Sequence, residues 1–247
     1  MGILRDAFRS FRHPPVLVFQ MGKVGSSAVR STLAAGRAGV VDQAHAIEQL
    51  GDEARAALGA CRAFGLRHLV ISPIRDPLSR NVSAFFENFT RDTGLAWSDA
   101  PSDPEALLGL FLRHARHDNG VAWFERRMQP AFGLDVYATP FDRARRAQEY
   151  RAGAARVLVY RTDLGRDEQL ALLARFTGRR LAGWVRQNEA ADKAYAERYE
   201  RFVAEARLPA SYADEILGSR FARHFWTDAE RAAQRARWTE PRPSASR

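Results

Sequence analysis

The chain has 247 residues, of which 46% are hydrophobic and 11% aromatic, a balance that is typical of a globular protein and excludes an intrinsically disordered one. Its formal charge of +9 at pH 7 favours polyanionic partners without choosing among them. The single cysteine, Cys61, excludes an intrachain disulfide and a cysteine-based zinc site, and no apolar run approaches the roughly 18 residues of a membrane helix. We therefore expect a soluble, cytoplasmic protein.

The first segment, residues 1–12, has an amphipathic helical pattern. One face carries Ile3, Leu4, Ala7, Phe8 and Phe11, and another carries Arg5, Arg9 and Arg12. The simpler interpretation is a terminal helix that packs on its own domain, as surface helices do. The alternative is a helix that lies on an anionic membrane surface, which would make the protein a peripheral membrane protein.

Residues 16–89 alternate between strand and helix patterns. The apolar run 16–20 predicts a strand, the glycine-bearing segment 21–25 a turn, and residues 26–35 a helix. Strands are predicted again at 39–42 and 68–72, with a helix over 47–64 between them. Asp76 is placed to cap, and Pro77 to open, a further helix that runs to about Phe89.

The second half of the chain is predicted to be mainly helical. We expect a loop at 97–104, helices at 105–116, 120–128 and 166–177, short strands at 134–138 and 156–160, helical spacing over 188–238, and a disordered tail at 240–247. The order of elements predicts an α/β fold: a three-layer α/β/α, P-loop-like domain with a mostly parallel central sheet. We expect one domain over residues 1–239, with its core at 14–180 and a helical C-terminal part at 188–239.

The turn after the first predicted strand has the parts of a phosphate site. Residues 20–27 read Gln-Met-Gly-Lys-Val-Gly-Ser-Ser, between a strand and a helix. Gly22 and Gly25 allow a close backbone approach, Lys23 supplies charge, and Ser26 and Ser27 add hydroxyls beside the N–H groups that begin the helix. Without a second signal, a purely structural turn is an equally good interpretation.

This loop differs from that of a nucleotide triphosphatase at two positions. Such a loop reads GxxxxGK followed by Ser or Thr, whose hydroxyl binds magnesium. Here Val24 follows Lys23, and Leu17 occupies the place of the first glycine. The loop therefore suits a phosphate that needs no metal.

The second signal lies at the end of the third predicted strand. Residues 74–86 read Ile-Arg-Asp-Pro-Leu-Ser-Arg-Asn-Val-Ser-Ala-Phe-Phe. Arg75 follows the strand directly, at the sheet edge where ligands of open α/β sheets collect. Ser83 lies two turns into the next helix.

Together, the two segments resemble the 5′-phosphosulfate loop and the 3′-phosphate motif of sulfotransferases that use PAPS (3′-phosphoadenosine 5′-phosphosulfate). Arg-Asp-Pro-x-x-Arg-x-Val-Ser-Ala-Phe is especially similar to carbohydrate sulfotransferases, and the similarity covers residues 16–89. The resemblance implies that Lys23 contacts the 5′-phosphosulfate, that the backbone of residues 22–27, Val24 included, surrounds it, and that Arg75 and Ser83 hold the 3′-phosphate. Arg80 is assigned to the helix surface or to a salt bridge.

The C-terminal half is more loosely similar to a bacterial family of capsular polysaccharide synthesis proteins. The segments that carry this similarity are 135–137 (Asp-Val-Tyr), 161–164 (Arg-Thr-Asp-Leu) and 223–226 (Arg-His-Phe-Trp). The two resemblances together imply a bacterial sulfotransferase of polysaccharide biosynthesis, whose acceptor is a carbohydrate or a small molecule that offers a hydroxyl or amine.

For the general base of such a transfer we select His45, because it follows the second predicted strand and should open onto the same edge as Lys23 and Arg75. Glu48 is the reserve candidate, and an ordinary loop histidine is the structural alternative. No metal site is expected: His114 and His117 lie three apart on a predicted helix, without a third ligand. Trp123, Phe124, Tyr195 and Tyr199 are assigned to the core rather than to base or sugar stacking.

Two other functions remain open. One is a nucleotide kinase or NTPase with a degenerate loop, for which Asp42 and Asp76 are the candidate magnesium ligands. The other is a non-catalytic module that binds acidic polymers, which would leave Arg75 and Ser83 without a role. Nucleic-acid binding has only net charge in its favour, and the sequence does not indicate an oligomeric state.

Overall fold

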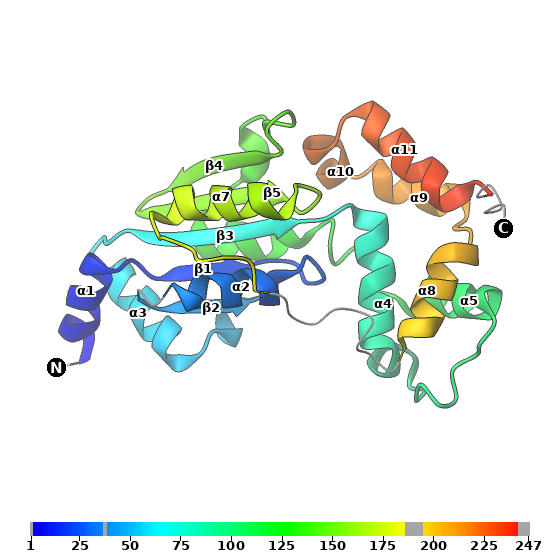
Figure 1. Cartoon of the computed structure of the whole chain (residues 1–247), viewed down its shortest axis with the longest axis horizontal. Coiled ribbons are helices and arrows are strands. Elements are labelled where there is room, and N and C mark those ends of the chain that lie inside the picture. Colours follow the sequence, from blue (N-terminus) through cyan, green and yellow to red (C-terminus); the bar gives the residue numbers. More distant parts are fainter. Residues whose placement is uncertain (1, 37–38, 186–194, 242–247) are drawn as a thin grey trace. The chain divides into compact units, whose positions relative to one another are not determined.

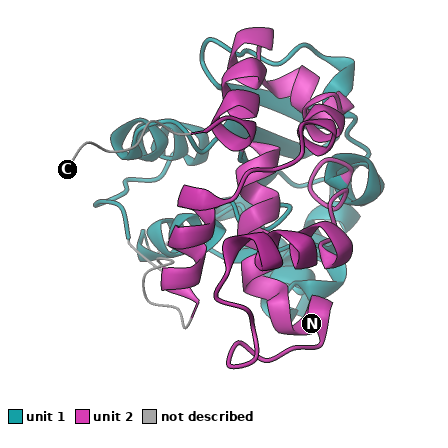
Figure 2. Cartoon of the chain, turned by 90° about the vertical axis from the view of Figure 1, so that its right-hand side faces the viewer, with its two compact units in different colours: residues 1–75, 123–188 teal, residues 76–122, 189–247 magenta. Residues whose placement is uncertain are grey.

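The computed structural model describes residues 2–36, 39–185 and 195–241. The chain divides into two compact units (Figure 2). Unit 1 comprises Met1–Arg75 and Trp123–Asn188, and unit 2 comprises Asp76–Ala122 and Glu189–Arg247. This division does not test the expected single domain over residues 1–239, which stays a prediction.

Unit 1 is built on a five-stranded sheet of order β2-β1-β3-β5-β4 (Figure 1). The strands are β1 (Val16–Phe19), β2 (Val41–Ala44), β3 (His68–Ile74), β4 (Ala147–Ala152) and β5 (Ala155–Arg161). All neighbouring strands are parallel except β4, which pairs antiparallel with β5. The predicted α/β class with a mostly parallel sheet is confirmed.

Helices cover both faces of this sheet. Unit 1 contains α1 (Gly2–Arg12), α2 (Ser26–Ala35), α3 (Asp52–Ala63), α6 (Gln129–Phe132) and α7 (Arg166–Thr177), with the short turns η1 (Ile47–Gln49), η2 (Phe124–Met128) and η3 (Val136–Ala138). Val29 and Leu33 of α2 and Leu173 of α7 pack on one face. The chain leaves β1 toward β2 and then returns past β1 to β3, so right-handed crossovers place α2 and α3 on opposite faces. The three-layer expectation is thereby met.

Two strand predictions need correction. Residues 134–138 form no strand, because the Asp135 side chain accepts a hydrogen bond from Tyr137 N (2.9 Å) and starts the 3-10 turn η3. The second strand begins at Val41 rather than at Gly39, because Gly39 has a φ of 72° that a strand does not accommodate. The antiparallel edge strand β4 was not predicted.

Three helix predictions also change. The expected helix over 47–64 is interrupted at Gly51, whose N–H donates to the Asp42 carboxylate (2.8 Å). In the stretch 120–128 only Phe124–Met128 is helical, as a π-turn. Within the described residues 195–238 the pattern becomes four helices, which begin after the caps Tyr195, Pro209, Ser219 and Thr227. Residues 186–194 and most of the expected tail, 242–247, lie outside the described residues.

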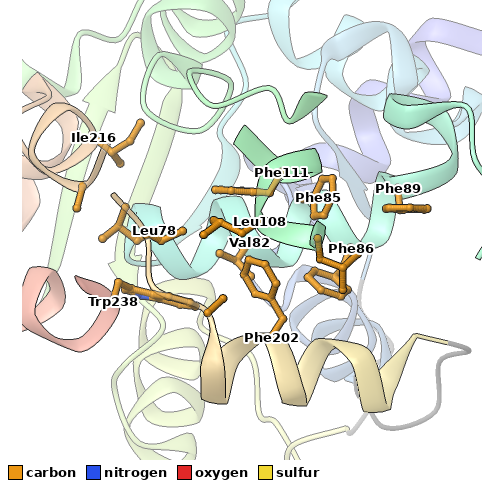
Figure 3. Packing of buried hydrophobic residues seen from close by; sticks show 14 of the residues in the cluster. Leu78, Val82, Phe85, Phe86, Phe89, Leu108, Phe111, Phe202, Ile216 and Trp238 are labelled. Carbon is orange, nitrogen blue, oxygen red and sulfur yellow. The ribbon is translucent and has the colours of Figure 1, made fainter. Parts of the chain in front are cut away.

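Unit 2 is a helical cluster around an aromatic core (Figure 3). Its helices are α4 (Pro77–Thr93), α5 (Pro104–His114), α8 (Ala196–Glu205), α9 (Ala210–Leu217), α10 (Arg220–Phe225) and α11 (Asp228–Thr239). The α4 helix begins as predicted, with Asp76 accepting from Ser79 N (3.0 Å) and Pro77 in the first turn. Among the described residues, none of the helices combines the length and apolar content that crossing a bilayer requires.

Phe86 is a central residue of this core, fully buried and in contact with the rings of Trp97, Tyr195, Tyr199 and Phe202. Phe86→Ala should therefore lower the stability of unit 2 by about 3–5 kcal/mol, through lost contacts and a residual cavity. Urea unfolding followed by circular dichroism measures this. Phe64→Ala, at a phenylalanine that is 47% exposed, is the matched control and should shift the transition little. Equal shifts for the two variants would contradict the packing described.

Candidate functional site

The candidate site lies where the strand order of the sheet reverses. The chain passes from β1 to β2 on one side and then to β3 on the other side of β1. The pairs Val16–Leu69 and Val18–Ile71 align β1 with β3, so their carboxyl ends open onto the same edge. Open α/β sheets bind ligands at such a reversal. The segments that follow β1 and β3 are the two that the sequence singled out.

The loop after β1 has an unusual backbone. Gly22, Lys23 and Gly25 have φ angles of 84°, 62° and 71°. A positive φ is ordinary for glycine but costs a lysine roughly 1–2 kcal/mol. The side chain of Val24 is buried and so anchors the loop in the protein interior. Left-handed residues in succession turn backbone N–H groups toward one point, which is how proteins build anion-binding concavities.

The helix that follows contributes further donors. Gly25 is the N-cap of α2 in the left-handed conformation, and no side chain caps the helix. The first backbone N–H groups of a helix lack intrahelical acceptors, and its N-terminus carries a partial positive charge. The first turn of α2 contains no acidic residue. Ser26 is buried and Ser27 is partly exposed there, so this end of the helix is suited to an anion.

Arg75 lies beside the loop. Its Nη1 is 3.5 Å from the carbonyl oxygen of Lys23, so the guanidinium reaches the loop from the neighbouring strand. The strand end that carries Arg75 is itself held: Ile74 O accepts from Thr162 N (2.9 Å) and from Thr162 Oγ1 (3.1 Å). The Arg75 guanidinium and the backbone of the Lys23 loop thus lie together at one edge of the sheet.

The segment after β5 reinforces this edge. Arg161 is paired with Ile74 in the sheet, and its buried guanidinium donates through Nε and Nη2 to the two carboxylate oxygens of Asp163. Sequence reasoning had noted residues 161–164 only for their similarity to a family. Their observed role is to fix the end of β3 from which Arg75 projects.

His45 is also on this edge, next to Gln20. His45 follows β2, and its Nδ1 lies 2.9 Å from Gln20 O and 3.0 Å from Gln20 Nε2. Its backbone is held by Gln49 Oε1, which accepts from His45 N (3.0 Å), and by Trp123 Nε1, which donates to His45 O (3.1 Å). The ring is exposed, whereas its attachment is fixed. Glu48 is exposed on η1.

Gln20 is a site residue that the sequence did not reveal. It is fully buried, and its Oε1 accepts from Gly22 N while its Nε2 faces His45. The side chain therefore joins the loop after β1 to the histidine after β2. The available signal was a polar residue that ends an apolar strand directly before the loop.

The remaining predicted residues of the second motif belong to unit 2. Ser83 lies on α4, partly exposed. Arg80 is buried within unit 2 and donates from Nη1 to Asn81 Oδ1 (3.1 Å), which corrects its placement on the helix surface. Burial lowers the pKa of Arg80 to about 10, so it stays charged at neutral pH. Asn81 in turn donates to His117 O and to the Tyr212 hydroxyl, and these bonds fasten α4 inside unit 2.

The acids that a magnesium site would need are engaged elsewhere. The two carboxylate oxygens of Asp42 accept from Gln43 N and Gly51 N (both 2.8 Å), and Asp76 caps α4. Within the described ranges, no group of three His, Cys, Asp or Glu residues is placed to hold a metal ion. His117 does not share a helix with His114, because α5 ends at His114 and the His117 ring is held by the Tyr212 hydroxyl (2.9 Å).

The structure also locates the aromatic residues that were assigned to the core, and it contains a separate hollow. Trp123, Phe124 and Tyr195 are buried, which confirms their assignment to the core, and Tyr199 packs against the core of unit 2. A separate hollow of about 290 Å³ in unit 1 is lined by Cys61, His68 and Phe132. Because His68 begins β3, this hollow opens at the amino end of the strands, away from the candidate site.

No protein-family model, curated protein or solved structure matches the chain.

The positive φ of Lys23 leads to a testable prediction about the stability of the protein. The φ of Lys23 is 62°, which glycine adopts more easily than alanine. The free energy of unfolding of Lys23→Gly, measured in urea, should therefore exceed that of Lys23→Ala by about 0.5–1 kcal/mol. The same pair of substitutions at Arg30, an exposed position inside α2, is the control and should give the opposite order, since glycine is the poorer helix former. An alanine variant at position 23 that equals or exceeds the glycine variant would contradict the strained loop.

Proposed function

We propose that this protein is a PAPS-dependent sulfotransferase. The observation that carries the proposal is the contact between Arg75 and the Lys23 loop, at the point where the strand order reverses. One nucleotide with a phosphosulfate at its 5′ end and a phosphate at its 3′ position matches two cationic strand-to-helix junctions side by side. The resemblance of the same two segments to sulfotransferase motifs supports the same ligand.

The residues of the loop fit the 5′ end of this donor. The Gly22 N–H donates to Gln20 Oε1, so the backbone after Gly22 and the N-terminus of α2 are proposed to meet the phosphosulfate oxygens. The Lys23 ammonium would offset the charge that develops on the leaving oxygen. Arginine suits the 3′-phosphate, because its planar fork can donate two parallel hydrogen bonds to one phosphate. Ser83, which the resemblance also assigns to the 3′-phosphate, stays a prediction.

The donor supplies an activated sulfuryl group, whose sulfur forms a bond to the acceptor oxygen or nitrogen as its bond to the bridging phosphate oxygen breaks. His45 is proposed to take the acceptor's proton. When Nδ1–H donates to Gln20 O, the lone pair of the neutral ring resides on Nε2, which is the tautomer that a general base requires. In this tautomer the backbone carbonyl of Gln20 orients the base, while its side-chain Oε1 supports the loop.

A kinase or NTPase with a degenerate loop is the main alternative. It is less well supported, because Asp42 and Asp76 serve backbone N–H groups instead of facing the loop as magnesium ligands. The acceptor is proposed to be a carbohydrate on the strength of the resemblance. Mass spectrometry of extracts from the native host, incubated with protein and PAPS, identifies the acceptor by the gain of one sulfuryl group.

The nucleotide preference is the first test. Calorimetry should show that 3′-phosphoadenosine 5′-phosphate (PAP) binds about 10- to 100-fold more tightly than ADP, because charge-assisted hydrogen bonds to the additional phosphate stabilise it. Arg75→Ala should remove most of this preference. Arg151→Ala, at an exposed arginine on β4, is the control and should leave it intact. Equal affinity for PAP and ADP, or tighter binding of ATP with magnesium, would favour the kinase alternative.

The second test separates binding from turnover. With an accepted carbohydrate, Lys23→Ala should lower kcat more than it weakens PAP binding, because the lysine acts on charge that grows during transfer. His45→Asn keeps an N–H donor for Gln20 O but has no base, and should lower kcat by about 10²–10⁴-fold with PAP affinity unchanged. The control is His13→Asn, at an exposed histidine. If His45→Asn keeps full turnover, another residue is the base, and Glu48→Gln is the next variant to measure.

A further inference from the structure

The helix α1 presents its large apolar side chains to solvent. It packs on α3 of the same unit through the small residues Ala7 and Ser10, with Arg9 pairing with Glu53. The four large apolar side chains are exposed: Ile3 by 52%, Leu4 by 65%, Phe8 by 63% and Phe11 by 74%. The helix therefore packs on its own domain, as the simpler interpretation has it, but through its small residues and not through its large apolar ones. A soluble domain does not usually expose two phenylalanines and a leucine on one short helix.

The exposed side chains form a continuous stripe with positive charge along its border. Leu4, Phe8 and Phe11 are spaced i, i+4, i+7 and so lie in one row along the helix. Arg5 and Arg12 each follow a stripe residue by one position and border the row. The Arg12 guanidinium carbon lies 5.1 Å from the centre of the Phe8 ring. The Arg5 side chain is 84% exposed, with its Nε 3.9 Å from Asp6 Oδ1.

We propose that α1 is a membrane-surface helix that binds anionic lipid bilayers. The stripe of Ile3, Leu4, Phe8 and Phe11 would enter the boundary between headgroups and acyl chains. The flanking guanidiniums would remain at the level of the lipid phosphates, as long cationic side chains do. One short helix gives weak and reversible membrane binding, as expected of a peripheral protein that exchanges between the membrane surface and solution.

The charges beside the stripe favour a bilayer over a second copy of the chain as the binding partner of α1. A symmetric dimer through the stripe would bring the Arg5 and Arg12 side chains of one copy close to those of the other, with their like charges facing. An anionic bilayer offers a flat apolar layer under a plane of negative charge, which is complementary to both parts of the helix. The formal charge of +9 adds a long-range attraction to the same surface.

The position of α1 keeps the candidate site accessible. The helix leads into the amino end of β1, at the left-hand end of the sheet in Figure 1, whereas the Lys23 loop follows the carboxyl end of β1. Lipid bound along α1 would therefore leave the loop edge of unit 1 uncovered. Nucleotide binding and lipid binding can accordingly be measured as independent properties.

Co-sedimentation of the full chain with lipid vesicles tests the proposal. Vesicles of phosphatidylcholine with about 30% phosphatidylserine should bind at least tenfold more protein than phosphatidylcholine alone at low salt, and the difference should shrink as salt rises. The double variant Phe8→Ser, Phe11→Ser should lose most of this binding. Leu95→Ser, at a leucine that is 36% exposed in unit 2, is the apolar control and should bind as the parent does.

The charge component is tested separately. Arg5→Gln with Arg12→Gln should weaken binding to the anionic vesicles by about tenfold or more, since each arginine near such a surface contributes about fivefold. Weak binding to neutral vesicles should remain. Arg151→Gln, on the edge strand β4, is the matched control. If neutral and anionic vesicles bind equally, the proposed role of charge is overturned.

A labelled single-site variant guards against loss of folding in the serine variants. Leu4→Cys labelled with an environment-sensitive dye should show a blue-shifted emission with anionic vesicles, whereas labelled Leu95→Cys should not; Cys61 is buried and does not compete for the dye. An unchanged Leu4 probe overturns the proposal. So does self-association that Phe8→Ser, Phe11→Ser abolishes in a chain that binds no vesicles, which would make the stripe a protein interface. Either result leaves the sulfotransferase proposal standing, because PAP binding is measured without lipid.

Discussion

The parallel pairing of β1 with β3 is the constraint on which the candidate site depends. Because β2 lies on the other side of β1, the strand order reverses between β1 and β3, which is where open α/β sheets bind their ligands. The register that joins Val16 to Leu69 and Val18 to Ile71 ends both strands at the same edge. This pairing brings the Arg75 guanidinium within hydrogen-bonding reach of the backbone carbonyl of Lys23, which lies 52 residues earlier in the chain. A shift of one residue would turn each alternating side chain of β1 to the other face and would move the loop away from Arg75.

The residues around this edge fix its shape through hydrogen bonds. Thr162 fixes the last carbonyl of β3, and the Arg161–Asp163 pair lies behind it, so Arg75 projects from a rigid strand end. Gln20 fixes the loop through its Oε1, which accepts from Gly22 N, and the histidine through its backbone carbonyl, which faces Nδ1. Asp42, the acid on the neighbouring strand, has both oxygens occupied by backbone N–H groups. Hydrogen bonds to backbone groups therefore hold the strand end, the loop and the acid of the neighbouring strand in place around this edge.

Local signals were enough to predict much of unit 1 from the sequence. The bounds of α2 and α7 were predicted to the residue, since a glycine flanks each end of both helices and the apolar spacing lies within them. The predictions failed in two situations. In one, a local polar contact decides the backbone conformation; in the other, the deciding contact comes from a segment that is distant in the sequence. Asp135 turns residues 136–138 into a 3-10 turn, and the exposed Glu149 and Arg151 hide the edge strand β4. The role of Gln20 needs β2 beside β1, and the exposed face of α1 depends on which side α3 covers, which periodicity does not reveal.

The lysine of the loop gives the strongest argument that the edge exists for a ligand. The turn needs left-handed backbone at positions 22, 23 and 25, and glycine provides it at two of them without strain. At position 23 a glycine would serve the fold better than a lysine, because the side chain costs free energy in that conformation. A fold that keeps the costly residue requires something that only the side chain supplies, and a strained residue in a ligand crevice is characteristic of a functional position. Here the side chain adds an ammonium group to a loop whose backbone carbonyl accepts from Arg75 and which leads into the N-terminus of α2, so under the proposed function this charge serves an anionic ligand.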